Sequence, residues 1–371
     1  MRQSFQIVAL LFISILFASS APNTSTPIPT KSSKRQVYSD RLAGLDLPLT
    51  PSVDAQLQRK IYQYVGRGGS GTELMLGRAE LYFPIFEMYL QQFELPVSLK
   101  YLPVAESLLR SKAVSSARAA GLWQLMPGTA RAYGLRVDNV VDERLNPHRS
   151  TEAAMRILRD LYIQFEDWSL VLAAYNSGSG RVRKAIRLAG THEYSQVKRY
   201  LPKETQQYVA AYLAAAYAVN FYGDHGLAPR AGKLNDQPLS YLRVYRELSL
   251  RKVARAADID YRYLRRLNPA YGRGYIPKNR VGHRLCVPKQ ALYATQRLVW
   301  MRDNLVEIQK HKPSKVAYQM ASDVGFNPYE WLFGCRYSPL LADNDLAWVE
   351  PYANVMVDNL FQREHALAMN P

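Results

Sequence analysis

The spacing of apolar residues over positions 53–222 constrains the fold of this 371-residue chain more than any other feature. Apolar side chains recur there at steps of three and four residues, and alternating β-branched residues are rare. Such spacing places the apolar side chains on one face of each of several helices. The sequence therefore predicts a mainly α-helical domain over residues 51–222. The expected helices cover residues 53–65, 78–93, 97–109, 127–133, 150–165, 168–175, 181–189 and 203–221.

The pattern of apolar residues changes after a linker that we expect at residues 223–238. Strand candidates at 241–246 and 283–288 flank two short helix candidates at 249–257 and 261–267, which predicts a small βααβ module over 239–289. Residues 290–371 are expected to be helical, with a helix over 292–309 and a pair of short helices over 315–333. A second degenerate copy of the module is an alternative for this C-terminal region.

The N-terminus indicates export. Arg2 precedes a short apolar run from Ile7 to Phe17, and small residues follow at 18–21. This is typical of a secretory signal peptide, here residues 1–20, although an uncleaved anchor is the alternative. No cysteine lies nearby, so we expect no lipid anchor of the bacterial lipoprotein type. Residues 21–50 begin rich in Pro, Ser and Thr and are expected to form a flexible linker.

The chain is strongly basic, with a formal net charge of +17. A basic surface attracts polyanions, and both nucleic acid and an acidic cell-wall polymer fit this charge. Lys and Arg are spread along the chain rather than gathered in one arm, which argues against nucleic acid as the partner.

The cysteines and histidines define no metal site. Cys286 and Cys335 are the two cysteines, and one disulfide or two buried thiols fit the sequence equally well. The six histidines lack ligand spacing, and no glycine-rich phosphate loop occurs. We therefore expect no metal and no organic cofactor.

Glu106 is the leading candidate for chemistry. In a helix over 97–109, Leu102 and Leu109 would share its face, so the carboxyl group would lie in an apolar stripe. Loss of hydration raises the pKa of a carboxyl group, which suits a general acid that must hold a proton near neutral pH. The alternative is a Glu at the edge of the stripe that reaches solvent.

Four motifs follow one another in the order Glu106-Ser107, Gly121 to Pro127 with Gln124 at its centre, Ala174-Tyr175-Asn176, and Glu204-Thr205 with Tyr208-Val209. Over residues 97–221 the chain resembles the family 1 lytic transglycosylases, which have a goose-type-lysozyme-like fold. The form Gly-Leu-Trp-Gln-Leu-Met-Pro-Gly-Thr-Ala is most similar to the membrane-bound lytic transglycosylase D branch.

The resemblance implies a role for each matching residue. Glu106 would be the general acid and then the base, and Ser115 would face the N-acetyl region of the substrate. Further roles are implied for cleft-lining Gln124 and Met126, for Tyr175, which would orient the sugar, for Asn176, which would hold that turn, and for Glu204 and Tyr208 on the opposite wall. Purely structural roles for Asn176 and Tyr208 are equally consistent.

One departure from the family pattern affects Ser115. The family has a Gly-Ala pair where this chain has Arg118-Ala119, and such a glycine often marks a positive φ that Arg tolerates poorly. A rebuilt loop would make Ser116 the alternative to Ser115.

The count of carboxylates bears on the reaction. Most glycoside hydrolases use two, but no second acidic residue lies near Glu106 in the sequence. The resemblance implies cleavage of the MurNAc-GlcNAc β-1,4 bond of peptidoglycan, with attack by the sugar's own C6 hydroxyl and a 1,6-anhydro product. A hydrolase in which Glu204 or a loop Asp positions water is one alternative. A non-catalytic cell-wall-binding protein is another.

The C-terminal module resembles a LysM domain, on Ser249-Leu250, Val253-Ala254, Leu267-Asn268-Pro269, Ile276-Pro277 and Leu285 to Pro288. The usual Gly after the first helix is replaced by Asp258-Ile259-Asp260. The resemblance implies binding of N-acetylglucosamine-containing glycans, and a structural unit without sugar binding is the alternative. The expected partners are thus peptidoglycan strands and no nucleic acid, with peripheral association with the cell wall of a bacterium, in the periplasm or cell envelope.

Overall fold

A computed structural model describes residues 31–66, 70–230 and 238–303. These residues separate into two compact units. The first contains the described residues up to 238 together with 265–274, and the second contains 239–264 and 275–303. The signal-peptide interpretation, Cys335 and the expectations for residues 304–371 fall outside the described residues.

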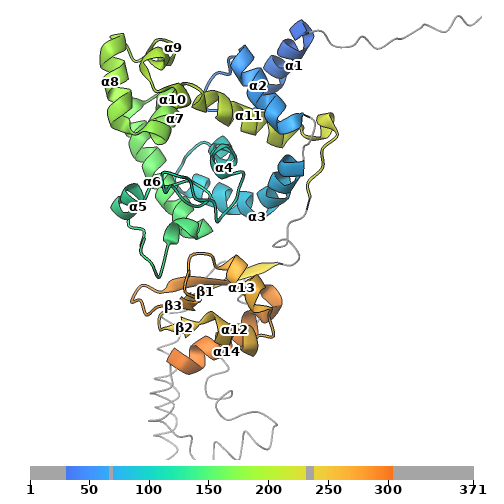
Figure 1. The fold of residues 1–371 in the computed structure, drawn as a ribbon, viewed down its shortest axis with the longest axis vertical. Helices are drawn as coiled ribbons and strands as arrows, with labels where there is room; N and C mark the ends of the chain where they lie inside the picture. Colours follow the sequence, from blue (N-terminus) through green and yellow to red (C-terminus); the bar gives the residue numbers. More distant parts are fainter. Residues whose placement is uncertain (1–30, 67–69, 231–237, 304–371) are drawn as a thin grey trace, which may run out of the picture. The chain divides into compact units, whose positions relative to one another are not determined.

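The first unit is helical (Figure 1). Its α-helices are α1 (Lys31–Ala43), α2 (Ala55–Val65), α3 (Ser70–Gln92), α4 (Leu102–Ser107), α5 (Pro127–Ala132), α6 (Pro147–Phe165), α7 (Trp168–Ser177), α8 (Ser179–Ala189), α9 (Tyr194–Val197), α10 (Lys203–Gln206) and α11 (Tyr208–Phe221). Short 3-10 helices are η1 (Val97–Tyr101), η2 (Glu143–Leu145), η3 (Lys198–Tyr200) and η4 (Gly223–His225).

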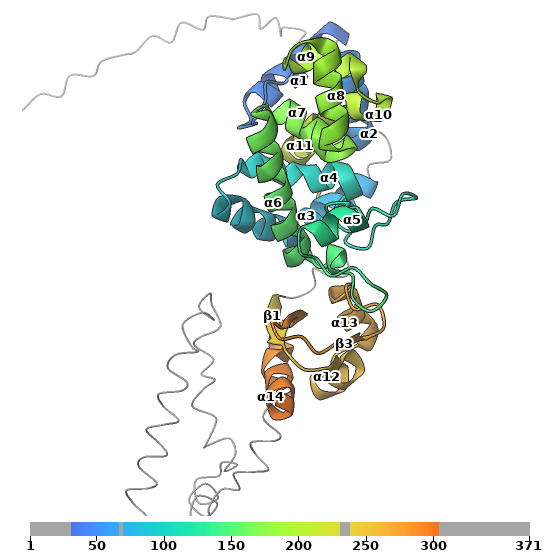
Figure 2. The same ribbon diagram turned by 90° about the vertical axis from the view of Figure 1, so that its left-hand side faces the viewer.

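The core of this unit is built around α11. This helix is apolar on all sides, and the side chains of Tyr212 and Tyr217 are fully buried. It packs against α2, α4 and α7. Figure 2 shows the short helix α4 between α11 above it and α3 below it, with α6 running alongside. A helix that is apolar all round has to be surrounded by protein, which explains its central place.

The prediction of a flexible linker over residues 21–50 is wrong for residues 31–43. Residues Lys31–Ala43 form α1, whose Leu42 is fully buried. Tyr38 meets Tyr217 of α11 edge to face with ring centroids 5.0 Å apart, and Arg41 donates a 2.6 Å hydrogen bond to the Tyr217 hydroxyl. These contacts order a segment whose composition alone suggested a tether.

Helix α6 begins earlier than the expected helix over 150–165. Asn146 is the N-cap, and its side chain accepts hydrogen bonds from the backbone of His148 and Arg149. Pro147 then occupies the first helical turn, where its missing N–H costs nothing. Ser150 and Thr151 are buried inside the helix instead.

The second region is the expected βααβ arrangement. Strand β1 (Leu239–Val244) pairs antiparallel with β4 (His283–Pro288), and β2 (Leu248–Ser249) pairs with β3 (Tyr275–Ile276). Helices α12 (Leu250–Ala256) and α13 (Tyr261–Leu267) lie between them in sequence, and η5 (Lys289–Ala291) and α14 (Leu292–Asp303) follow. Asp258 has a φ of 49°, a left-handed conformation that glycine adopts readily and that Asp tolerates better than most residues.

The mainly α expectation with a small βααβ module is confirmed. No helix within the described ranges combines the length and apolarity needed to cross a bilayer. Cys286 lies buried in β4.

Candidate active site

Glu106 lies in the last turn of α4, one residue before the helix ends. The expected single helix over 97–109 is instead the 3-10 helix η1 followed by α4. Leu108 and Leu109 adopt left-handed φ values of 52° and 58°, which terminate the helix. The proposed helical face shared by Glu106 and Leu109 is therefore wrong, although Leu109 is fully buried.

Buried hydrogen bonds hold this helix end. The Ser107 hydroxyl donates to the carbonyl oxygens of Pro103 at 3.0 Å and Leu122 at 2.9 Å. Arg78 of α3 donates through Nη1 to the Leu108 carbonyl at 2.8 Å. Left-handed conformations at two successive leucines cost free energy, which such surrounding contacts must offset. The position of Glu106 is thus set by contacts within α4 and by partners from two other segments, the loop at Leu122 and helix α3.

The environment of Glu106 suits a general acid. Its side chain is half-buried, and burial raises the pKa of its carboxyl group to about 7. A hydrogen bond from the Tyr208 hydroxyl to Oε1 lowers this pKa, and the negative charge of Glu204 raises it. Glu106 therefore keeps its proton close to neutral pH, as a proton donor to a leaving group requires.

Two tyrosines accompany Glu106. The expected helix over 203–221 breaks at Gln207 into α10 and α11, which makes buried Tyr208 the first residue of α11. Tyr175 of α7 donates a 2.8 Å hydrogen bond to the carbonyl oxygen of Trp123. Burial, with the charge of Glu106 added, raises the pKa values of both tyrosines well above their usual range. Both therefore remain neutral hydrogen-bond donors.

Asn176 and Glu204 lie beside this pair. The Asn176 side chain accepts a 2.8 Å hydrogen bond from the Thr205 hydroxyl, which joins α7 to α10. Glu204 is exposed, and its charge acts on the pKa values of Glu106 and Tyr208. Asn176 therefore has a structural contact, whereas Glu204 has an electrostatic one.

The loop that carries Ser115 is a tight hairpin. Ser115 and Ala119 exchange hydrogen bonds, and Arg118 has a φ of 67°. Three-residue hairpin loops usually place glycine at this last position. The turn is therefore retained, with Arg118 in the left-handed conformation, rather than rebuilt.

A buried arginine ties this hairpin to the next loop. Arg144 donates to the carbonyl oxygens of Arg118 at 2.6 Å and Leu125 at 3.0 Å, and it forms a 2.8 Å ion pair with Asp142. Gly121 passes so close that a Cβ there would lie 1.9 Å from the Arg144 carbonyl oxygen. Sequence reasoning missed Arg144, because nothing in its local sequence distinguishes it from an exposed arginine.

Gln124 is fixed by its own loop. It has a φ of 46°, and its side-chain amide donates to the carbonyl oxygens of Gly121 at 2.8 Å and Ala113 at 3.2 Å. These bonds occupy the side-chain nitrogen, and Gln124 lines the cleft.

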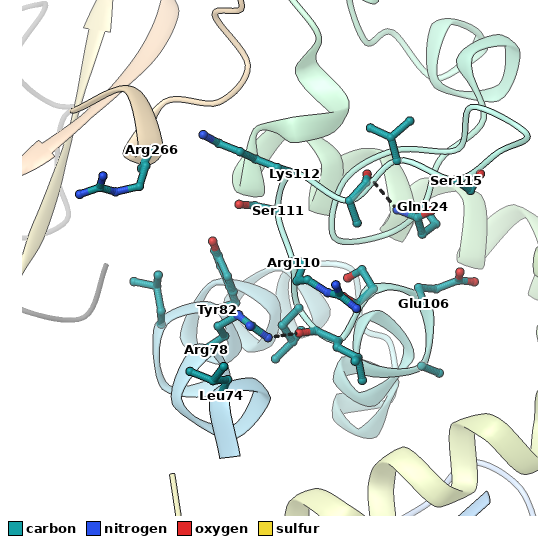
Figure 3. Close-up of a pocket in the computed structure, with 17 residues that line it drawn as sticks. Leu74, Arg78, Tyr82, Glu106, Arg110, Ser111, Lys112, Ser115, Gln124 and Arg266 are labelled. Carbon is teal, nitrogen blue, oxygen red and sulfur yellow. Dashed lines mark hydrogen bonds between the residues drawn. The ribbon is translucent and has the colours of Figure 1, made fainter. Parts of the chain in front are cut away.

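A cleft of about 800 Å³ runs past Glu106 (Figure 3). It is lined by Leu74, Arg78, Leu81, Tyr82, Ala105, Glu106, Ser107, Leu108, Leu109, Arg110, Ser111, Lys112, Ala113, Val114, Ser115, Gln124 and Arg266. The structure thus brings Glu106, Ser115 and Gln124 to one cleft. The other predicted site residues are not among the lining residues: Met126, which is 45% exposed, Tyr175, Asn176, Glu204 and Tyr208.

Comparison with known families first gives the class. Residues 84–198 match the transglycosylase SLT domain. The second match is more specific: residues 239–296 match the LysM-like domain of lytic transglycosylase MltD. The resemblance to lytic transglycosylases of the D branch is confirmed by these two matches, which occur in the expected order.

Known relatives agree over part of the chain. Membrane-bound lytic murein transglycosylase D of Escherichia coli K12 is 41% identical over 140 residues, which make up 37% of this chain and 31% of that protein. The match therefore spans less than a third of the relative's own length.

Two solved structures show weaker likeness. The soluble lytic transglycosylase Slt70 of Escherichia coli is 20% identical with a TM-score of 0.35, covering 53% of this chain and 34% of that one. The lytic transglycosylase Slt of Pseudomonas aeruginosa is also 20% identical with a TM-score of 0.35, covering 53% of this chain and 42% of that one.

Proposed function

We propose that this protein is a peptidoglycan lytic transglycosylase that cleaves the β-1,4 bond between N-acetylmuramic acid and N-acetylglucosamine. The observation that carries the proposal is the pKa of about 7 for Glu106, which lines the cleft and accepts a hydrogen bond from Tyr208. The SLT-domain match over residues 84–198 supports the same class of reaction.

In the proposed reaction, Glu106 alone carries the proton, first as the acid and then as the base. Protonated Glu106 donates its proton to the glycosidic oxygen, and the bond from that oxygen to C1 of the muramic acid breaks. The N-acetyl carbonyl oxygen of the same sugar stabilises the positive charge at C1. The C6 hydroxyl then attacks C1, and the Glu106 carboxylate takes the hydroxyl proton. The product is a 1,6-anhydro sugar, and no water is consumed.

The remaining residues position the substrate in this proposal. Ser115 faces the N-acetyl region, and the Gln124 side-chain oxygen accepts from the sugar. Tyr175 orients the sugar, and Asn176 holds the α7–α10 contact that supports it. Glu204 and Tyr208 are not among the residues that line the cleft, and in this proposal they act on the pKa of Glu106. Met126, away from the described lining, would contact only a longer glycan.

In this proposal the LysM-like module keeps the enzyme bound to the cell wall. The LysM-like match over 239–296 supports binding of N-acetylglucosamine-containing strands, and the net charge of +17 supports association with an acidic wall polymer. The similarity to a membrane-bound relative supports an exported protein of the bacterial cell envelope.

Mass spectrometry of the soluble products from purified peptidoglycan tests the reaction type. We expect muropeptides that end in 1,6-anhydro-N-acetylmuramic acid. The electrostatic link between Glu204 and Glu106 favours one rival, a hydrolase in which Glu204 positions a water molecule. Products that end in reducing sugars and carry ¹⁸O from labelled water would establish that rival instead.

Glu106→Gln tests the catalytic assignment. Glutamine keeps the size of the side chain but has no acidic proton to give. We expect release of soluble fragments to fall by at least about a thousandfold, in keeping with the contribution of proton transfer and of a positioned acid. Unchanged release would show that Glu106 is not the acid and that another group carries the cleavage.

A further inference from the structure

The cleft extends beyond Glu106 into an arm lined by cations. Arg78 comes from α3, and Arg110 and Lys112 come from the segment after α4. In Figure 3 Arg78 and Lys112 lie on the side of the cleft away from Glu106 and Ser115, Arg110 lies between Arg78 and Glu106, and the Lys112 side chain extends toward Arg266. The cation arm, defined here as Arg78, Arg110 and Lys112, is not used by the reaction proposed above.

The positive charges of this arm are not neutralised by the described part of the protein. Arg78 donates to the Leu108 carbonyl, and Arg110 donates through Nε to the Ser107 carbonyl at 3.3 Å. These partners are neutral, and none of the three cations forms an ion pair within the described residues. Burial and the neighbouring charge of Arg110 lower the pKa of Arg78, which is consistent with adjacent like charges.

Such an arrangement suits an anionic ligand. Like charges repel, so a cluster without a counter-ion is stabilised when an anion enters it. The wall of the arm also holds apolar side chains, Leu74, Leu81 and buried Tyr82. The arm therefore combines cations with a surface for a carbon chain, and a bare sugar ring uses neither feature fully.

We propose that the cation arm is a subsite for a carboxylate carried by a substituent of the glycan strand. The inference rests on the proposed function, which places the strand across Glu106. Two sources share this chemistry: the carboxylates of peptides attached to the strand, and the lactyl carboxylate exposed when those peptides are absent. Guanidinium and ammonium groups both form charge-assisted hydrogen bonds with such an anion.

The test uses the full chain and the double variant Arg110→Ala/Lys112→Ala. Arg78 is left intact because it holds the end of α4. The matched control is Lys184→Ala/Arg187→Ala, which removes two exposed cations from α8. Steady-state cleavage is measured on soluble glycan strands that bear peptides, on the same strands with every carboxylate amidated, and on strands stripped of peptide.

We expect the double variant to raise KM about tenfold on peptide-bearing strands with a smaller effect on kcat, as the loss of two exposed charge pairs predicts. Amidation should raise the wild-type KM toward that of the double variant. If the double variant also raises KM on stripped strands, the carboxylate belongs to the lactyl group. If it raises KM only on peptide-bearing strands, the carboxylate belongs to the peptide. An equal loss on amidated and unmodified strands would overturn the subsite.

Two further measurements separate the possible failures. The wild-type KM on unmodified strands should rise with NaCl while that on amidated strands stays flat, a result independent of any variant's folding. The charge-conserving variant Arg110→Lys/Lys112→Arg should keep most of the affinity. If the wild type cleaves none of the three substrates, the proposed function fails. If it cleaves all three without a carboxylate effect, only the subsite fails.

Discussion

The hydroxyl of Tyr208, the first residue of α11, donates a hydrogen bond to Oε1 of Glu106 in the last turn of α4. The two residues are 102 positions apart in sequence. Burial raises the pKa of Glu106, and this hydrogen bond opposes the rise because it stabilises the ionised carboxylate. Together with the negative charge of Glu204, which also raises it, these effects leave the pKa at about 7.

Tyr208→Phe should shift the pH dependence of cleavage upward. The variant removes the effect that lowers the pKa of Glu106, so the acid form persists to higher pH. In a plot of kcat/KM against pH, we expect the alkaline decline to occur about one pH unit higher, which corresponds to the free energy of one hydrogen bond. The control is Tyr212→Phe, which removes a buried hydroxyl bonded to the Ser98 carbonyl on the same helix. An alkaline decline that stays in place in Tyr208→Phe would contradict the role of this hydrogen bond.

Glu204→Gln should shift the alkaline decline of kcat/KM to lower pH. The negative charge of Glu204 raises the pKa of Glu106, so its removal lets Glu106 ionise at lower pH. Glu204 is exposed, and we expect a shift below about one pH unit that high salt largely removes. Kinetic pH profiles at low and high NaCl measure it, with exposed Glu193→Gln as the control. An upward shift would show that Glu204 acts through structure rather than through its charge.

Glu106→Gln should stabilise the fold at alkaline pH. Folded Glu106 holds its proton up to about pH 7, whereas an unfolded Glu loses it near pH 4.3. Folded chains therefore bind more protons between these values, and the stability contributed by protonated Glu106 is complete below about pH 4.3 and lost as pH rises through 7. Glutamine does not ionise, so the variant does not lose stability in this way as the pH rises. Urea unfolding should show it gaining about 2 kcal/mol over the wild type between pH 5 and pH 8; a pH-independent difference would argue against the raised pKa.

Arg118→Gly should stabilise the hairpin of Ser115. Arg118 has a φ of 67°, a conformation that costs a residue with a Cβ about 1 kcal/mol and glycine little. We expect a gain of up to about 1 kcal/mol in the free energy of unfolding. Ala117→Gly in the same turn is the control, because Ala117 has no positive φ, and it should cost about 0.5 kcal/mol. Similar effects from both substitutions would mean that φ at 118 carries no strain.

Sequence reasoning predicted the helices of the first unit better than their ends. It missed the end of α4 at Ser107, because Leu108, Leu109 and Arg110 contain no helix-breaking residue. The break is imposed by tertiary partners, namely the Leu122 carbonyl on Ser107 and Arg78 on Leu108. It missed α1 for the same reason, since the contact of Tyr38 with Tyr217 joins the two ends of the unit.

The sequence by itself determined the class of fold, the two modules, and Glu106 with its ordered companions, because periodicity and motif spacing are local properties of the chain. It also indicated the departure at Arg118. Only the tertiary structure decided which hydroxyl meets Glu106, where its proton titrates, and that Arg78 of α3 joins Arg110 and Lys112. A pKa and a charged subsite depend on burial and on neighbours from distant segments, and these exist only once the chain has folded.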